Sequence, residues 1–217
     1  RHGMSGYPRA NKITVFSFDG QIDRWRRAIG LSGDLAPQQG RAEMTPGLAD
    51  QDNGVAVIPE PDGHGPGRVI DTPLSEDAIT GIAIGAAMSG MRPIHVHIRM
   101  DFLLLCMNQL INMGAKAHYM YGGQVKVPLV MRSIIGKSWG QGAQHSQGLH
   151  SMFMHVPGLK VVAPTNAHDA KGCLIAAIRD NNPVVFVEHR LLYSTDAPVP
   201  EDPYTVDFGK ARVVGEG

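Results

Sequence analysis

Short apolar runs and helical stretches alternate along the chain from Arg68 onward. The apolar runs lie at residues 68–71, 93–98, 127–131, 159–163 and 184–187, and the helical stretches at 76–88, 101–120, 146–154 and 166–179. The runs are apolar at consecutive positions, as expected for strands that are covered on both faces. This alternation predicts an α/β fold in which a mostly parallel sheet is covered by helices on both faces.

The first 66 residues have a different character, because they are rich in Gly, Pro, Asp and Gln and show little periodicity. Within them, residues 13–18 and 55–58 could form strands and residues 21–29 a short helix. We therefore expect three parts: a largely irregular segment at residues 1–66, a folded domain at 67–191 and an extended linker at 192–217.

Composition and charge exclude several classes of protein. The formal net charge is 0, so no basic field points to nucleic acid or to an anionic membrane surface. The sequence contains no run of about 18 apolar residues, which a membrane-spanning helix would need. The 2 cysteines fall in apolar helical stretches without a CxxC spacing, which argues against a disulfide framework and indicates a reducing compartment.

The helix that begins near Glu76 carries a carboxylate in its first turn, directly after an apolar strand. Ser75 is a suitable N-cap, and an acid in the first turn suits the helix dipole. Gly81 and Gly85 are four residues apart and lie on one face, although each glycine costs about 1 kcal/mol relative to alanine. Another backbone or a ligand is expected to come close to that face; a tightly packed, capped core helix is the alternative.

Three histidines could carry chemistry. His145 follows the glycine-containing loop 136–142, where open α/β sheets bind ligands, and an imidazole there can exchange protons near neutral pH. The alternative is a loop histidine bonded to local backbone. His95 and His97 alternate on a strand and point to one face, which would suit zinc, but the sequence indicates no third ligand.

Five motifs occur in order along the chain: residues 68–76, 119–124, 143–147, 156–162 and 177–183. Together they resemble the beta subunit of the decarboxylating component of 2-oxo acid dehydrogenase complexes. Pyruvate, branched-chain and acetoin enzymes share this layout. The spacing of Glu76, Gly81-Ile82 and Gly85 resembles the pattern on the transketolase-like pyrimidine-binding domain of thiamine-diphosphate enzymes. The resemblance covers about residues 68–214.

The resemblance implies roles for four side chains. Glu76 would bond N1′ of the aminopyrimidine ring of thiamine diphosphate, Phe102 would pack on that ring, and Leu74 would lie beside it. His145 would be a second catalytic residue, near the reacting carbon and the lipoyl entry. The implied reaction is decarboxylation of a 2-oxo acid, after which the acyl unit passes to a lipoyl group.

The resemblance also implies that the cofactor site is shared with a partner. In the family, an alpha subunit holds Mg²⁺ and the diphosphate through a Gly-Asp-Gly motif, which this sequence lacks. We expect an alpha2beta2 heterotetramer that docks the lipoyl domain of the acyltransferase, in the bacterial cytoplasm or, as second choice, the mitochondrial matrix. A structural potassium ion is implied at Leu129, Ala177, Ile178, Asp180 and Asn182.

The chain departs from the family pattern in three places. Residues 11–66 do not match the expected opening, which is either native divergence or a disturbed coding frame. Val96 stands where an acidic residue is common, and the linker at 192–217 would lead to a C-terminal domain that the chain lacks. Two alternatives follow: a truncated or degenerate subunit that associates without catalysis, and a transketolase-like enzyme.

Overall fold

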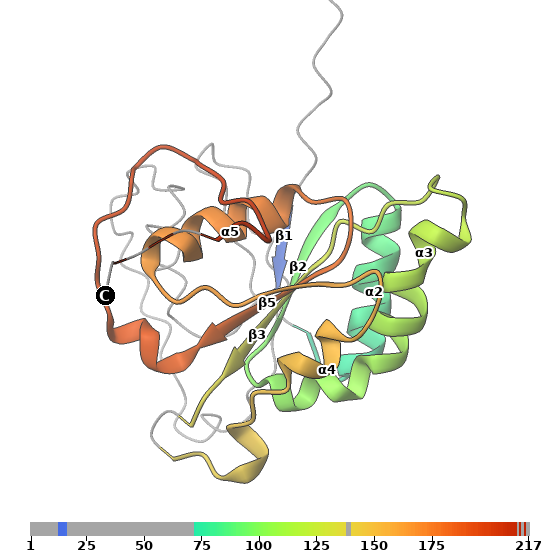
Figure 1. The fold of residues 1–217 in the computed structure, drawn as a ribbon. Helices are drawn as coiled ribbons and strands as arrows, with labels where there is room; N and C mark the ends of the chain where they lie inside the picture. Colours follow the sequence, from blue (N-terminus) through green and yellow to red (C-terminus); the bar gives the residue numbers. More distant parts are fainter. Residues whose placement is uncertain (1–12, 17–71, 138–139, 212, 214, 216–217) are drawn as a thin grey trace, which may run out of the picture.

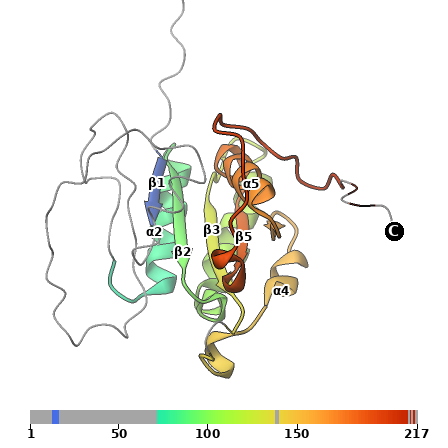
Figure 2. The same cartoon turned by 90° about the vertical axis from the view of Figure 1, so that its left-hand side faces the viewer.

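The computed structural model describes residues 13–16, 72–137, 140–211, 213 and 215. They form a five-stranded sheet in the order β1-β2-β3-β5-β4, and every neighbouring pair is parallel. The strands are β1 (Ile13–Phe16), β2 (Arg92–His97), β3 (Val130–Ile135), β4 (Lys160–Val162) and β5 (Val184–His189). Figure 2 shows β1, β2, β3 and β5 side by side. The parallel sheet predicted from the sequence is confirmed, whereas the elements expected at residues 21–29, 55–58 and 68–71 lie outside the described residues.

Helices cover both faces of the sheet, as predicted. The helix α5 (Ala167–Arg179) lies on one side, and α2 (Glu76–Met88) and α3 (Ala115–Met120) lie on the other (Figure 1). Each side has its own buried core. Leu174 of α5 packs with Val130 and Phe186, whereas Ile84 of α2 packs with Met131 and the other strand residues that point its way. Alternate residues of each buried strand therefore serve two different cores.

The helix predicted at residues 101–120 is helical throughout but changes its winding. It begins as the 3-10 helix η2 (Met100–Cys106), continues as the π-helix η3 (Asn108–Gly114) and ends as α3. Met100, Leu103 and Cys106 are fully buried at three-residue spacing, which matches the three residues per turn of a 3-10 helix. Periodicity indicated the helix but not the change of winding.

The strand expected at residues 127–131 lies three residues later in the structure, as β3. Pro128 has no N–H to donate, so the regular pairing begins only at Val130. The strand also continues past Met131, where it was expected to end. Arg132 is buried and its Nη2 donates to Glu188 Oε2 of β5 at 2.7 Å. A charged pair with matched partners thus replaces apolar contacts at this end of the sheet.

The helix expected at residues 146–154 is shorter, because α4 spans only His150–Met154. The residues before it form a loop that is held by a hydrogen bond from Gln147 to Asp101. By contrast, α5 begins where predicted, since the side chain of Asn166 accepts a hydrogen bond from Asp169 N at 2.8 Å.

The segment expected as a linker begins with the 3-10 helix η5 (Arg190–Ser194) and then runs extended along α5. Lys171 of α5 is 1% exposed, and its Nζ donates to the carbonyl of Glu201 at 2.9 Å. Tyr204 Oη donates to His168 O at 2.8 Å. Among the described residues, no helix is both long and apolar enough to cross a bilayer.

Candidate functional site

Glu76 is the first residue of α2, directly beside the end of β2. Ser75 occupies the N-cap position, but its hydroxyl donates to Asp77 Oδ1 at 3.2 Å and makes no bond to the helix backbone. Ser75 is thus at the predicted N-cap position, but its side chain does not cap the helix backbone. Asp77 accepts in its place from Ala78 N at 2.7 Å. Two carboxylates lie in this first turn, where the helix dipole favours negative charge.

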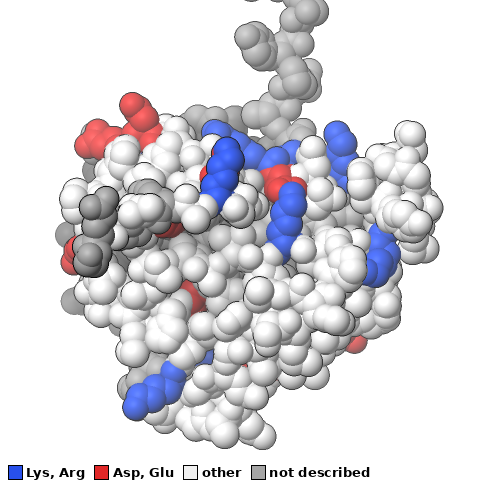
Figure 3. Space-filling model, viewed as in Figure 1, with Lys and Arg blue, Asp and Glu red and all other residues white. Residues whose placement is uncertain are grey.

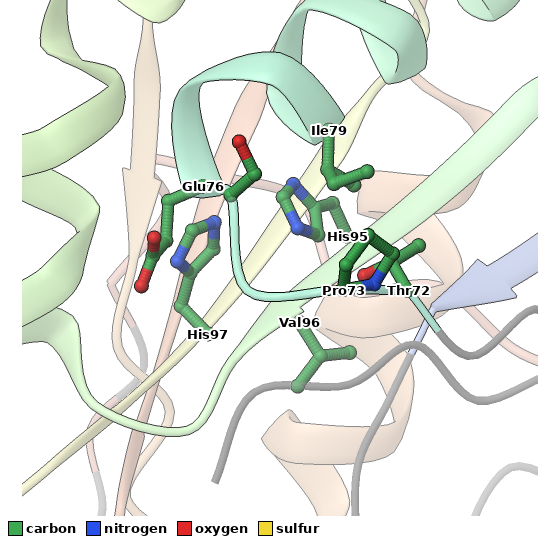
Figure 4. Close-up of a pocket in the computed structure, with 8 residues that line it drawn as sticks. Thr72, Pro73, Glu76, Ile79, His95, Val96 and His97 are labelled. Carbon is green, nitrogen blue, oxygen red and sulfur yellow. The ribbon is translucent and has the colours of Figure 1, made fainter. Parts of the chain in front are cut away.

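A hollow opens beside Glu76. It is shallow and open to solvent, and it is lined by Thr72, Pro73, Ser75, Glu76, Ile79, His95, Val96 and His97. In Figure 4 the carboxylate of Glu76 and the ring of His97 lie next to each other on one side of the hollow, while Thr72 and Pro73 lie on the other. The site therefore joins the beginning of α2 to β2, as expected at the carboxyl end of a parallel sheet.

His95 and His97 point from β2 toward α2. His95 Nδ1 lies 3.2 Å from the hydroxyl of Thr80, and the centroids of the two rings are 4.3 Å apart. Burial lowers the pKa of His95 to about 4. Burial and the neighbouring His95 lower the pKa of His97 as well. Both rings are therefore neutral near pH 7, and the buried Nε2 of His97 has no hydrogen-bond partner in the described part of the chain.

The zinc alternative for this histidine pair gains no support from the structure. Within the residues that the structure describes, no three His, Cys, Asp or Glu side chains gather as a metal-binding group.

Phe102 and His145 come together from two separate segments. Phe102 belongs to η2, and His145 ends the short 3-10 helix η4 (Ala143–His145). Their ring centroids are 5.2 Å apart in an edge-to-face arrangement. The loop that carries His145 is fixed by Asp101, whose Oδ1 accepts from the backbone N of Gln147 at 3.3 Å and from its Nε2 at 2.7 Å.

The predicted site residues thus fall into two groups at the same end of the sheet. Glu76 lies with the histidine pair. Phe102, on the segment that directly follows β2, lies against His145, on the loop that follows β3. Leu74 is 51% exposed and precedes α2. The sequence did not single out Asp101, because its contact with Gln147 joins residues 46 positions apart.

The five residues predicted for potassium lie where α5 turns into β5 and at the segment before β3. They are Leu129, Ala177, Ile178, Asp180 and Asn182. Two of their carbonyls are occupied by a cation from the protein itself, because Arg92 Nη1 donates to Ile178 O and to Asp180 O, each at 2.8 Å. Sequence reasoning had given no role to Arg92.

Known proteins are similar to most of this chain in sequence. The family model described as the transketolase pyrimidine-binding domain matches residues 18–195. The beta subunit of acetoin:2,6-dichlorophenolindophenol oxidoreductase from Cupriavidus necator is 50% identical over 199 residues, which cover 92% of this chain and 51% of that protein. The beta subunit of the pyruvate dehydrogenase E1 component from Rickettsia bellii is 42% identical over 187 residues, covering 86% of this chain and 54% of that protein.

Among solved structures, a split-gene transketolase, described as an inactive beta4 tetramer, matches with a TM-score of 0.48 and 17% identity over 58% of this chain and 38% of that chain. The chain spans about half the length of the two curated relatives. The family match begins well before residue 67, and the predicted division at that residue stays a prediction. From its match over residues 18–195, this chain belongs to the transketolase pyrimidine-binding domain family.

Proposed function

We propose that the chain is the beta-type subunit of a thiamine-diphosphate-dependent 2-oxo acid dehydrogenase and carries the pyrimidine half of the cofactor site. The observation that carries this proposal is the placement of Glu76, Phe102 and His145 at one end of the parallel sheet. The relatives at 50% and 42% identity, which are beta subunits of acetoin and pyruvate enzymes, support it.

Three side chains at this end of the sheet suit an aminopyrimidine ring, and one of them, Glu76, lines the hollow. Glu76, in the first turn of α2, would hold the proton at ring N1′, and Phe102 would pack on the ring with Leu74 beside it. Leu74 is half exposed, and Glu76 and Phe102 are only partly buried, so each has surface left for a ligand. When bound, thiamine diphosphate supplies the electron sink for decarboxylation.

His145 would act on the substrate side of the same site. Its ring lies against the edge of Phe102, and the hydrogen bonds from Gln147 to Asp101 hold its loop in place. An imidazole held in this way can move a proton near neutral pH. We infer that His145 serves the acyl transfer to the lipoyl group.

A partner subunit would complete the site. Apolar side chains are exposed along α2, η2, η3 and α3, among them Ile82 (62%), Leu105 (59%), Met113 (50%) and Met120 (66%). Charged side chains are sparse on the side that carries α3 and α4 (Figure 3). An uncharged, apolar surface of this kind suits another subunit. We propose an alpha subunit that holds the diphosphate and Mg²⁺, in an alpha2beta2 heterotetramer that docks a lipoyl domain.

The open face of α2 supports the same proposal. A Cβ on Gly85 would meet nothing within 4 Å, and one on Gly81 would meet only the side chain of Gln109, at 3.8 Å. The two glycines predict that another backbone packs closely against this face of α2. No backbone among the described residues does so. A helix of the partner subunit would fit against this face. The location expected for the complex, the bacterial cytoplasm or the mitochondrial matrix, stays a prediction.

Dye-coupled turnover tests the proposed function. The chain would be co-purified with its alpha partner and assayed with pyruvate, a branched-chain 2-oxo acid and acetoin; acetoin is included because the relative at 50% identity is an acetoin enzyme. Turnover that requires added thiamine diphosphate and Mg²⁺ is the expected result. A stable complex without turnover on any of the three substrates would contradict the proposal and favour a non-catalytic subunit.

A further inference from the structure

We propose that the guanidinium of Arg92, rather than a potassium ion, is the cation that holds the C-terminal end of α5, so that the stability of the chain does not depend on potassium. Arg92 is the first residue of β2, whereas the carbonyls it contacts lie 86 and 88 positions later, at the end of α5. Arg92 lies at the end of the sheet where β2 begins, and Glu76 lies at the opposite end, so this role of Arg92 is independent of the proposed function.

The geometry of Arg92 carries this inference. Its Nη1 donates to the carbonyls of Ile178 and Asp180, both at 2.8 Å, and its Nη2 donates to Asn181 Oδ1 at 3.0 Å. The guanidinium thus binds three oxygens of one turn with its planar fork of donors. Two of these oxygens belong to Ile178 and Asp180, which are among the residues that the family resemblance assigns to potassium.

The other carbonyls of that set have backbone donors. Leu129 O accepts from Val184 N at 2.9 Å, and Ala177 O accepts from Asp180 N at 3.2 Å. Since these bonds belong to the beginning of β5 and to the end of α5, they persist only while the two elements keep their positions. A potassium ion would have to share all three carbonyls expected to bind it, those of Leu129, Ala177 and Ile178, with donors already present.

The charges of the turn lead to the same conclusion. Lys160 forms an ion pair with the carboxylate of Asp180, whose Oδ1 also accepts from Asn182 N at 2.9 Å. Two cations therefore already act on Asp180, because Lys160 pairs with its carboxylate and Arg92 binds its backbone carbonyl. A third positive charge placed about 4 Å from Arg92 would be repelled by roughly 1–4 kcal/mol, depending on how well water screens the site.

Arg92 also satisfies a need that the helix itself creates. The last carbonyls of an α-helix have no intrahelical donor and carry partial negative charge, and a cation at this end stabilises them. Arg179, the basic residue in the last turn of α5, is exposed. Arg92 reaches the same helix end from β2 and so ties the beginning of one strand to the end of the helix that covers the sheet.

Thermal unfolding in different salts tests the inference. The full chain, with its partner subunit if the two co-purify, would be unfolded in KCl, NaCl and choline chloride at equal ionic strength. The variants are Arg92→Gln and, as a matched control, Arg179→Gln, which removes the same charge from the same helix end. We expect one midpoint for the wild type in all three salts and a midpoint roughly 2–8 °C lower for Arg92→Gln.

The control should change little, within about 2 °C. Because Arg92→Gln frees two carbonyls, KCl should raise the midpoint of this variant above its value in choline chloride. A specific rise of the wild-type midpoint in KCl would overturn the inference, and so would an Arg92→Gln variant that is as stable as the control or equally insensitive to KCl. If Arg92→Gln does not fold, Arg92→Lys replaces it, with the same expectation of a lowered midpoint.

Discussion

Two neutral histidines occupy positions on β2 that a covered strand usually gives to apolar residues. His95 is 4% exposed and His97 is 2% exposed, and each lies between apolar neighbours along the strand. Burial holds the pKa of His95 at about 4, against an ordinary value of 6.5. The folded chain thus binds fewer protons than the unfolded chain between these two values.

This difference predicts that the chain loses stability in acid. As pH falls from about 6.5 toward 4, His95 becomes protonated in the unfolded chain but stays neutral in the folded one. The free energy of unfolding should therefore fall with pH in this window, by up to about 1.4 kcal/mol per pH unit for each such histidine. Urea unfolding at a series of pH values measures this slope.

His95→Val should reduce the slope, because valine fits a covered strand and does not titrate. His155→Gln is the matched control, since His155 is exposed and its loss should leave the slope unchanged. His97 still titrates in the His95→Val variant, so part of the slope should remain. A slope that is equal in His95→Val and the wild type would contradict this account.

At the scale of the elements, the loop at residues 143–147 depends on one carboxylate. Asp101 is 7% exposed, and Gln147 provides both of its hydrogen bonds from this loop. Gln147→Ala removes the side-chain bond, which is worth about 1.5–3 kcal/mol because the acceptor is charged. We expect faster hydrogen exchange of the loop amides, by roughly 10-fold or more, without a change in the core.

Gln144→Ala, at an exposed position in the same loop, is the control and should leave exchange unchanged. Equal exchange in the two variants would contradict the role of Asp101.

The turn between α4 and β4 needs glycine for two separate reasons. Gly158 has φ of 99°, and a Cβ on it would lie 2.0 Å from Ala115 O of α3. Gly158→Ala should lower the free energy of unfolding by roughly 3–5 kcal/mol, the sum of backbone strain and overpacking. Gly90→Ala separates the two, because Gly90 has φ of 95° and open space around it, so strain alone predicts about 1–2 kcal/mol. Equal losses in urea unfolding would show that the contact with α3 does not matter.

The sequence predicted those elements that depend on apolar pattern and local caps. It identified β2, β4, β5, α2 and α5 nearly in place, since each combines a continuous pattern with a clear beginning or end. It placed β3 too early, because the pairing of Arg132 with Glu188 is not visible in either segment alone. The predicted α4 was too long for a similar reason. Gln147 is compatible with a helix, and its hydrogen bond to Asp101, which holds it in a loop, is not visible in the local sequence.

The same distinction applies to the site. Motif spacing pointed to Glu76, Phe102 and His145, and the structure brings Phe102 and His145 together. The supporting contacts, His95 to Thr80 and Gln147 to Asp101, join residues 15 and 46 positions apart. The sequence around each residue does not indicate these contacts, because several other polar residues could serve equally well as the hydrogen-bond partner.

At the scale of the whole molecule, the chain provides one side of a site. Glu76 borders a hollow that is open to solvent, and large apolar side chains are exposed on α2 and on the helical segments after β2. We therefore expect the isolated chain to bind thiamine diphosphate weakly and the complex with an alpha subunit to bind it tightly. Titration of the cofactor against the chain alone and against the co-purified pair, by calorimetry, checks this. Equal affinity in both would contradict the shared site.

The most direct test of the account is the turnover of the co-purified pair with Glu76→Gln. Glutamine keeps the size of the side chain but cannot hold the proton at the ring nitrogen, so turnover should fall by about 10²–10⁴-fold. Glu201→Gln, at an exposed position, should keep wild-type turnover. Both variants should still form the complex, which size-exclusion chromatography verifies. Wild-type turnover in an intact complex that carries Glu76→Gln would contradict the central claim that Glu76 serves the cofactor.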